Sequence, residues 1–144
     1  MMKTLTAAAA VTLGLGFASA AFAAPPPLVN ESTIAQIGVD STAIVSQRGG
    51  NNNQGTFQVG GLNFAYTTQY GATSKGYNGA NTDQVGFGNF ATTTQSGGGY
   101  NNSTTAQFGF FNTAMTSQTS SSAVTNNSTT FQAGAFNHAM VTQH

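Results

Sequence analysis

The sequence predicts an all-β protein: a five-repeat β-solenoid of strand-turn-strand units that forms two stacked parallel sheets, a cross-β, amyloid-like arrangement. Ten of its eleven glutamines fall into five pairs, and the members of every pair are eleven residues apart. Between glycine-rich turns the residues alternate with a period of two, which is the periodicity of a strand. Runs that favour helices, rich in Ala, Leu, Glu and Lys, do not occur after Ala24. An internal repeat of this kind decides the fold before local propensity does.

The first 23 residues are typical of a secretory signal peptide. Lys3 supplies a short positive segment, residues 5–22 are apolar or small, and Ala21-Phe22-Ala23 is a small-x-small cleavage site. We therefore predict cleavage after Ala23 and a secreted protein. The alternative is a membrane anchor, but this Ala- and Gly-rich stretch ends in the cleavage site and in prolines. No later stretch approaches the length that spans a bilayer, so no stable membrane insertion is expected.

The chain that remains after cleavage is almost uncharged. Its charged residues are Glu31, Asp40, Arg48, Lys75 and Asp83. Two positive and three negative residues give a net charge of about −1, which does not attract nucleic acid or anionic lipid. The chain has no cysteine, so an exported form has no disulfide framework. No cofactor and no nucleic-acid partner are expected.

Repeats fill residues 32–144, after a short N-terminal segment at 24–31. The five units span about 32–47, 54–69, 80–95, 103–118 and 128–143. Successive first glutamines are 22, 26, 23 and 25 residues apart, so all insertion is confined to the links between units. The links are rich in Gly and Asn, which adopt positive φ readily, and are expected to be loops. A second turn is expected inside each unit, after its first glycine.

Four kinds of residue recur at fixed positions in the units. The paired glutamines are Gln36 and Gln47, Gln58 and Gln69, Gln84 and Gln95, Gln107 and Gln118, and Gln132 and Gln143. Five residues after each first glutamine come Ser41, Asn63, Asn89, Asn112 and Asn137. Seven residues after it come Ala43, Ala65, Ala91, Ala114 and Ala139. The turn glycines, two residues after it, are Gly38, Gly60, Gly86, Gly109 and Gly134.

These recurring positions are predicted to face inward, between the two sheets, while the aromatic residues face outward. Their positions are fixed, whereas the aromatic residues move between positions from unit to unit. A buried amide without a partner costs roughly 1–3 kcal/mol. If units stack in register, each glutamine N–H can donate to the side-chain carbonyl of the equivalent glutamine in the next layer. The alternative is a soluble polar repeat whose amides face solvent.

The ends of such a solenoid expose strand edges, and open edges template further pairing. The first unit begins soon after the prolines at 25–27, and the fifth runs to Gln143. Uncapped, similar ends predict open-ended polymerisation into a cross-β fibre. Asp40 and Asp83 are candidate gatekeepers, because a charge beside a strand slows such assembly.

The repeat resembles the curlin repeat of bacterial curli fibres. The resemblance covers about residues 32–143 and includes both glutamines, the glycine and the alanine of every unit, with Ser41 in place of Asn in the first. It implies an extracellular amyloid subunit of a cell-surface fibre used in adhesion and biofilm matrix. The implied partners are further copies of the chain, a nucleating curli subunit and the outer-membrane curli secretion channel. The family's major subunit has a Gly- and Asn-rich export segment that the short segment 24–31 does not match. The intact fifth unit favours a major over a minor nucleating subunit.

Other function classes are less well supported by the sequence. A soluble β-solenoid that binds ice or carbohydrate needs outward threonines at the same positions in every unit. The outward position after each alanine instead holds Ile44, Tyr66, Thr92, Met115 and Met140. The three acids that remain after cleavage lie in different units with no histidine near them in sequence, so no enzyme is expected. His138 and His144 lack a third ligand and close spacing, so no metal site is expected.

Overall fold

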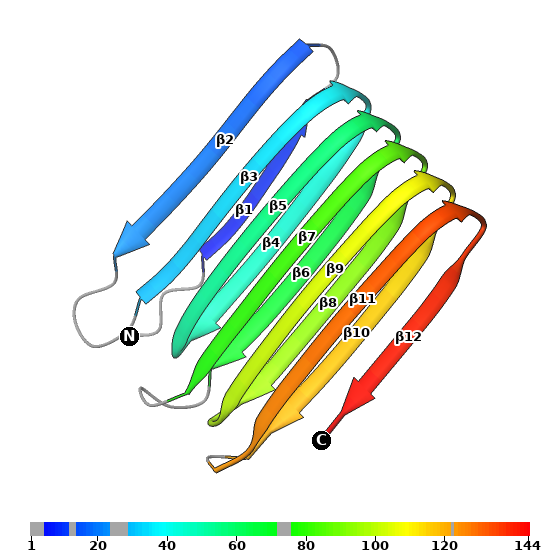
Figure 1. The fold of residues 1–144 in the computed structure, drawn as a ribbon. Coiled ribbons are helices and arrows are strands. Elements are labelled where there is room, and N and C mark those ends of the chain that lie inside the picture. Colours follow the sequence, from blue (N-terminus) through cyan, green and yellow to red (C-terminus); the bar gives the residue numbers. More distant parts are fainter. Residues whose placement is uncertain (1–4, 12–13, 24–28, 72–75, 122) are drawn as a thin grey trace.

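The computed structural model describes the backbone of residues 5–11, 14–23, 29–71, 76–121 and 123–144, and the side chains within these ranges from residue 29 onward. The described residues form two six-stranded sheets that lie face to face (Figure 1). The first sheet has the order β11-β9-β7-β5-β3-β2 and the second the order β1-β4-β6-β8-β10-β12. The strands of the first sheet are β2 (Gly14–Ala23), β3 (Val29–Val39), β5 (Asn51–Gly61), β7 (Tyr77–Phe87), β9 (Tyr100–Phe110) and β11 (Thr125–Ala135). Those of the second are β1 (Leu5–Val11), β4 (Ser41–Gly49), β6 (Phe64–Gly71), β8 (Phe90–Gly97), β10 (Thr113–Ser120) and β12 (His138–Gln143).

From β3 onward each unit contributes one strand to each sheet, so the chain winds as a solenoid. Equivalent strands pair in parallel and in register: Gln58 pairs with Gln36 and Gln84, and Gln95 pairs with Gln69 and Gln118. This confirms the predicted all-β solenoid of two stacked parallel sheets. The register aligns every recurring position with its copy one layer away.

The first-sheet strands begin earlier than the predicted units. They start at Val29, Asn51, Tyr77, Tyr100 and Thr125, three residues before the predicted unit starts. Segments expected to be loops, such as 51–53 and 100–102, are therefore strand. The physical reason is a side-chain bond between layers: Asn52 and its equivalents point inward and pair with each other, which holds a residue of low strand propensity in the sheet.

A tight turn joins the two strands of each unit, and its glycine is required. Gly86 has a φ of 127°, and a Cβ built on it would lie 1.9 Å from the carbonyl oxygen of Gly109 in the next layer. The other turn glycines, Gly38, Gly60, Gly109 and Gly134, share a positive φ. The close approach of backbones thus adds to the conformational reason for glycine.

The N-terminal strands β1 and β2 differ from the rest. They pair antiparallel with β4 and β3, at one end of the two sheets (Figure 1). Both lie within residues 1–23, which we predict to be a signal peptide. Residues 24–28 of the predicted N-terminal segment lie outside the described part of the chain, and residues 29–31 begin β3.

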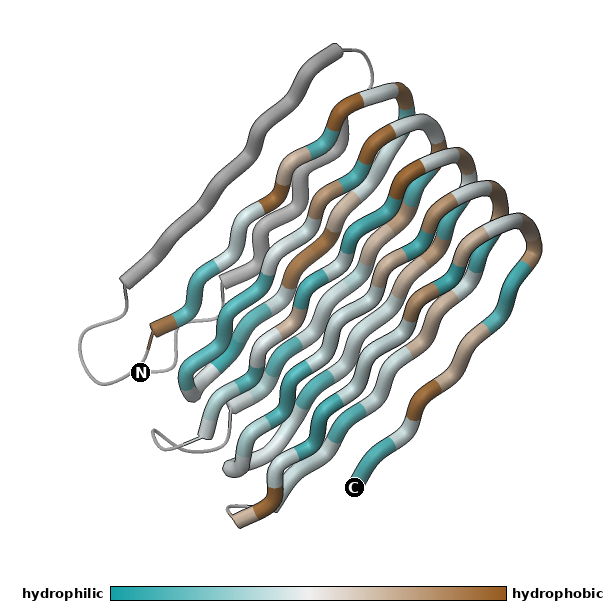
Figure 2. The backbone as a smooth tube through the Cα atoms, in the orientation of Figure 1, coloured by the Kyte–Doolittle hydropathy of each residue, from teal (hydrophilic) through white to brown (hydrophobic). Residues whose placement is uncertain are grey.

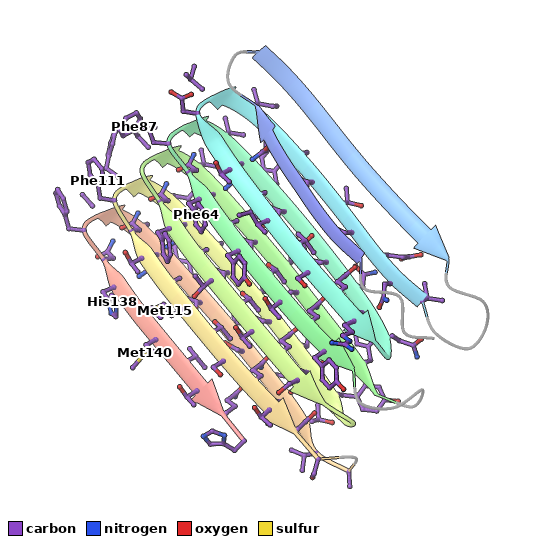
Figure 3. All side chains as sticks on the ribbon, turned by 180° about the vertical axis from the view of Figure 1, so that it is seen from behind. Phe64, Phe87, Phe111, Met115, His138 and Met140 are labelled. Carbon is purple, nitrogen blue, oxygen red and sulfur yellow. The ribbon has the colours of Figure 1, made fainter. Side chains whose placement is uncertain are left out.

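The interior is polar and the outer surface holds the large apolar side chains. Buried side chains are chiefly Gln, Asn, Ser and Thr, and the small apolar cluster is Ile34, Ala43, Val45 and Ala65. Apolar residues gather along the turn edge of the first sheet (Figure 2). Figure 3 shows Phe87 and Phe111 projecting at that edge, and their rings meet edge-on with centroids 5.9 Å apart. The prediction that the recurring polar positions face inward is therefore confirmed.

Candidate functional site

Two columns of stacked glutamines run through the interior. In the column of Gln36, Gln58, Gln84, Gln107 and Gln132, each Nε2 donates to the next Oε1 at 2.5, 2.6, 2.8 and 2.8 Å. In the column of Gln47, Gln69, Gln95, Gln118 and Gln143 the corresponding distances are 2.8, 2.8, 2.8 and 2.6 Å. The predicted glutamine ladder is therefore present in both columns, and nearly all its members are fully buried.

Every glutamine of the two columns after Gln36 also donates across the interior to a backbone carbonyl. Gln84 Nε2 donates to Phe64 O at 3.0 Å, and Gln95 Nε2 donates to Gly79 O at 2.7 Å. Both carbonyls belong to strands of the opposite sheet. The amide group thus ties its own column together and holds the two sheets at a fixed distance, which an apolar side chain of the same size does not do.

An asparagine column secures the turns. Asn89 Nδ2 donates to Asn63 Oδ1 at 3.1 Å and to the carbonyl oxygen of Gly109 at 3.1 Å, and Asn89 N also donates to Asn63 Oδ1. Asn112 and Asn137 repeat the pattern with the preceding asparagine. The column begins at Asn63, because Ser41 in the first unit has a buried Oγ without a partner.

Sequence reasoning missed a second asparagine column. It contains Asn30, Asn52, Asn78, Asn101 and Asn126, whose side chains are all buried. Each Nδ2 donates to the preceding Oδ1, at 2.7, 2.8, 2.8 and 3.1 Å. The pattern that could have found it is plain: an asparagine stands six residues before the first glutamine of every unit.

The alanine column lets the sheets approach each other. Ala43, Ala65, Ala91 and Ala114 are at most 1% exposed, as expected for small residues between stacked sheets. The last member, Ala139, is only half-buried. It lies on β12, at the edge of the second sheet.

The two candidate gatekeepers occupy different places. Asp40 lies in the turn between β3 and β4 with a φ of 54° and is exposed. It stands between the last residue of β3 and the first residue of β4, so its charge lies at the strand ends and not within a strand. Asp83 lies on the outer side of β7 between Phe57 and Ala106 of the adjacent strands, and accepts a hydrogen bond from Asn81 Nδ2 at 3.1 Å. Of the two candidates, Asp83 is the one that lies within a strand.

The described residues contain no group of three or more His, Cys, Asp or Glu that could hold a metal ion. His138 is exposed and alternates with the inward Asn137 and Ala139, as predicted (Figure 3). Within the same ranges, no helix has the length and apolar character needed to cross a membrane. No protein-family model, curated protein or solved structure matches the chain.

The end of the solenoid formed by β11 and β12 is where the interior opens. The inward residues Asn112, just before β10, and Thr116 and Gln118 on β10 are buried. Their equivalents one layer on are Asn137, just before β12, and Val141 and Gln143 on β12, and all three are half-buried.

Proposed function

We propose that this chain is a secreted structural subunit that polymerises into an extracellular amyloid-like fibre. The observation that carries the proposal is the open edge at β12, where the glutamine column from Gln47 and the asparagine column from Asn63 stop at the half-buried residues Gln143 and Asn137. A strand edge whose backbone and side chains both match the next layer is a template for a further copy.

Energetics favour addition of a copy. A copy that adds in register forms a complete parallel strand pair on each sheet and extends three amide columns, because its first unit supplies Gln36, Gln47 and Asn30 but has Ser41 at the turn position. Each hydrogen bond gained contributes about 1 kcal/mol, and each buried amide left unpaired costs roughly 1–3 kcal/mol. The low charge of the chain leaves little repulsion to oppose assembly.

The resemblance to the curlin repeat extends the proposal to a cellular setting. After removal of residues 1–23 the chain leaves the cell through the outer-membrane curli secretion channel and joins a curli-type fibre for adhesion and biofilm matrix. Its partners are other copies of itself and a nucleating curli subunit. The alternative role in the same fibre is that of the minor nucleating subunit.

Fibre formation by the chain from Ala24 onward tests the proposal directly. On removal of denaturant we expect a lag, then binding of an amyloid dye and fibres whose diffraction has reflections near 4.7–4.8 and about 10 Å. A chain that stays a soluble monomer at micromolar concentration, with or without preformed seeds, contradicts the proposal.

One outer row favours a second candidate, a soluble surface-binding module for ice or carbohydrate. Ser46, Thr68, Thr94, Ser117 and Thr142 align across the second sheet, so this row holds a hydroxyl in every layer. The neighbouring outward row, from Ile44 to Met140, holds only one hydroxyl-bearing aliphatic residue, Thr92. This candidate requires a stable monomer that binds ice or a polysaccharide, and the experiment above separates it from the fibre subunit.

A further inference from the structure

The two methionines that remain after removal of residues 1–23 lie side by side on the outer surface. Met115 on β10 pairs in register with Met140 on β12, so their backbones are about 4.8 Å apart. Both side chains are exposed, Met115 by 41% and Met140 by 70%. The same outward row holds Tyr66 and Thr92 in earlier layers, so packing does not require methionine there. The stacking of layers therefore does not explain this pair of thioethers.

A histidine stands beside the pair. His138 is exposed and precedes Met140 by two residues on β12, so both side chains leave the same face of the strand, about 6.8 Å apart. Met115 is diagonally opposite His138, which the strand spacing and rise place roughly 8 Å away. Figure 3 shows the three labelled side chains close together at the edge formed by β12. Two flexible methionines and an imidazole can reach a common point above the sheet from these positions.

The three side chains are accessible from solvent. A shallow groove next to the methionines is lined by Met115, Met140 and the hydroxyl residues Thr92, Ser117 and Thr142. Among the described strands, β12 is at the edge of the second sheet, so His138 and Met140 have a neighbouring strand on one side only. A small ion can therefore approach the cluster without any displacement of the fold.

The chemistry of these ligands selects a soft ion. Thioether sulfur is a soft ligand that favours Cu(I), and imidazole also binds copper. Zn²⁺ takes thiolate, imidazole or carboxylate, and Ca²⁺ and Mg²⁺ take oxygen. The chain has no cysteine, and its carboxylates are on β3, on β7 and in the turn between β3 and β4. Neither a thiolate nor a carboxylate side chain therefore joins this cluster, which matches Cu(I) better than the harder ions.

We propose that Met115, His138 and Met140 hold one Cu(I) ion through two thioether sulfurs and one imidazole nitrogen. A single copy of the chain forms the site, so the site does not rest on self-assembly. Met115 belongs to the fourth unit and the other two ligands to the fifth, and the register of β10 with β12 brings them together. Ligation thus ties the edge strand to its neighbour and stabilises the folded chain, because the unfolded chain lacks the three-ligand arrangement.

Anaerobic equilibrium dialysis against Cu(I) kept in solution by acetonitrile tests the site in the chain from Ala24 onward, soluble or assembled. We expect one Cu(I) per chain, and an X-ray absorption spectrum with two sulfurs and one nitrogen around the copper. Met115→Leu, Met140→Leu and His138→Gln are each expected to weaken binding about tenfold or more, since each removes one ligand. His144→Gln removes the other histidine and is expected to leave the affinity unchanged.

An exchange within one outward row separates the folded site from the composition of the chain. Thr92→Met combined with Met115→Thr keeps every residue count and places the moved methionine two layers from Met140, about 9.6 Å away. This double variant is expected to bind Cu(I) as weakly as Met115→Leu. The parental chain in denaturant is expected to be equally weak, because unfolding separates the methionine of β10 from the ligands of β12.

Three results overturn the proposal. One is a folded parental chain that takes up no Cu(I) at a micromolar concentration of the free ion. Another is parental affinity in Met115→Leu, which would mean that His138 and Met140 hold the ion alone. The third is parental affinity in the exchanged variant. Failure of the parental chain to form fibres would contradict the proposed function and leave these measurements of copper binding as they stand.

Discussion

At the residue scale, the buried side-chain amide is the unit on which the interior depends. Gln95 accepts a hydrogen bond from Gln69, donates to Gln118, and donates to Gly79 O in the opposite sheet. Only an identical residue in the next layer supplies both the donor and the acceptor at the right height. A substitution in one layer therefore leaves groups unpaired in the two layers beside it.

Replacement of Gln95 by Glu makes assembly pH-dependent. The carboxylate would face the Oε1 of Gln118 and the carbonyl of Gly79, so burial raises the pKa of this carboxyl in the folded layer. Because the folded pKa is raised, the variant is stabilised when protonated and loses that stability as pH rises through it. Seeded growth followed by dye binding is expected below the ordinary glutamate pKa of about 4.3 and is expected to be lost near neutral pH.

Thr94→Glu is the matched control, since Thr94 is the exposed neighbour of Gln95 on the same strand. It is expected to grow at both pH values, because its carboxylate remains in water. Growth of Gln95→Glu at neutral pH, at the parental rate, would mean that the column does not govern assembly.

The recurring residues show what sequence could and could not supply at this scale. The glutamine, alanine and turn-glycine columns follow from their spacing. The turn propensity of asparagine predicts loops at Asn52 and its equivalents. Pairing of their side chains between layers overrides this local propensity and holds them in strands. The sequence does not predict the direction in which the amides of a column donate, since identical residues can stack with their amides donating either way. Backbone carbonyls such as that of Phe64, which accepts from Gln84 Nε2, determine this direction.

At the scale of the element, the turn within each unit sets the height of the layers. Its glycine carbonyl accepts from an asparagine of the preceding layer, as Gly86 O accepts from Asn63 at 3.0 Å. Its Cα faces the next backbone so closely that there is no room for a side chain. The turns are therefore stacked as tightly as the strands.

Replacement of Gly86 by Ala is expected to block regular stacking. The new Cβ would lie 1.9 Å from Gly109 O at a φ of 127°, so the two layers must separate. Backbone strain of this kind costs on the order of 1–3 kcal/mol, before any loss of column contacts. A cost of about 2 kcal/mol raises the critical concentration for fibre growth roughly 30-fold, measured as the monomer left at equilibrium.

Gly55→Ala provides a control on the same sheet. A Cβ there meets only the side chain of Asn81, with Oδ1 at 2.8 Å, and this exposed side chain can rotate away. Its critical concentration is expected to stay within a few-fold of the parent. Equal effects of the two substitutions would show that loss of glycine flexibility, rather than the close approach of the turns, limits assembly.

At the scale of the whole molecule, a polar interior is combined with an apolar and nearly uncharged exterior. Phe111 and Phe136 stack with centroids 5.6 Å apart, and Phe64 and Phe90 with centroids 5.1 Å apart, all on outer positions. The fold class and the inward face follow from periodicity and from fixed positions. The exact strand starts do not, because they depend on which side chains find partners in adjacent layers.

Asp83→Asn is expected to accelerate fibre elongation. The half-buried carboxylate lies between Phe57 and Ala106, so its desolvation opposes addition of a copy. In a fibre with one Asp83 carboxylate per five layers, successive carboxylates are about 24 Å apart, which is beyond the screening length at physiological salt. Added salt is therefore expected to have little effect on the elongation rate of the parental chain. The half-time of seeded growth measures both the effect of Asp83→Asn and the effect of salt on the parental chain.

Asp40→Asn keeps a residue that tolerates the left-handed turn and removes an exposed charge from the turn between β3 and β4. Its elongation rate is expected to remain close to that of the parent. If Asp83→Asn grows no faster than the parent, Asp83 does not act as a gatekeeper.

The strand ends that the links between units join lie along one edge of the solenoid, opposite the tight turns (Figure 1). The links absorb the whole variation of 22 to 26 residues between units without disturbing a column. A peptide inserted between β10 and β11 therefore costs little, since loop closure grows slowly with length. In a fibre of copies stacked along the solenoid axis that insert recurs once per copy, about every 24 Å. The same edge would make the fibre a one-dimensional display scaffold with a fixed pitch for grafted enzymes or epitopes.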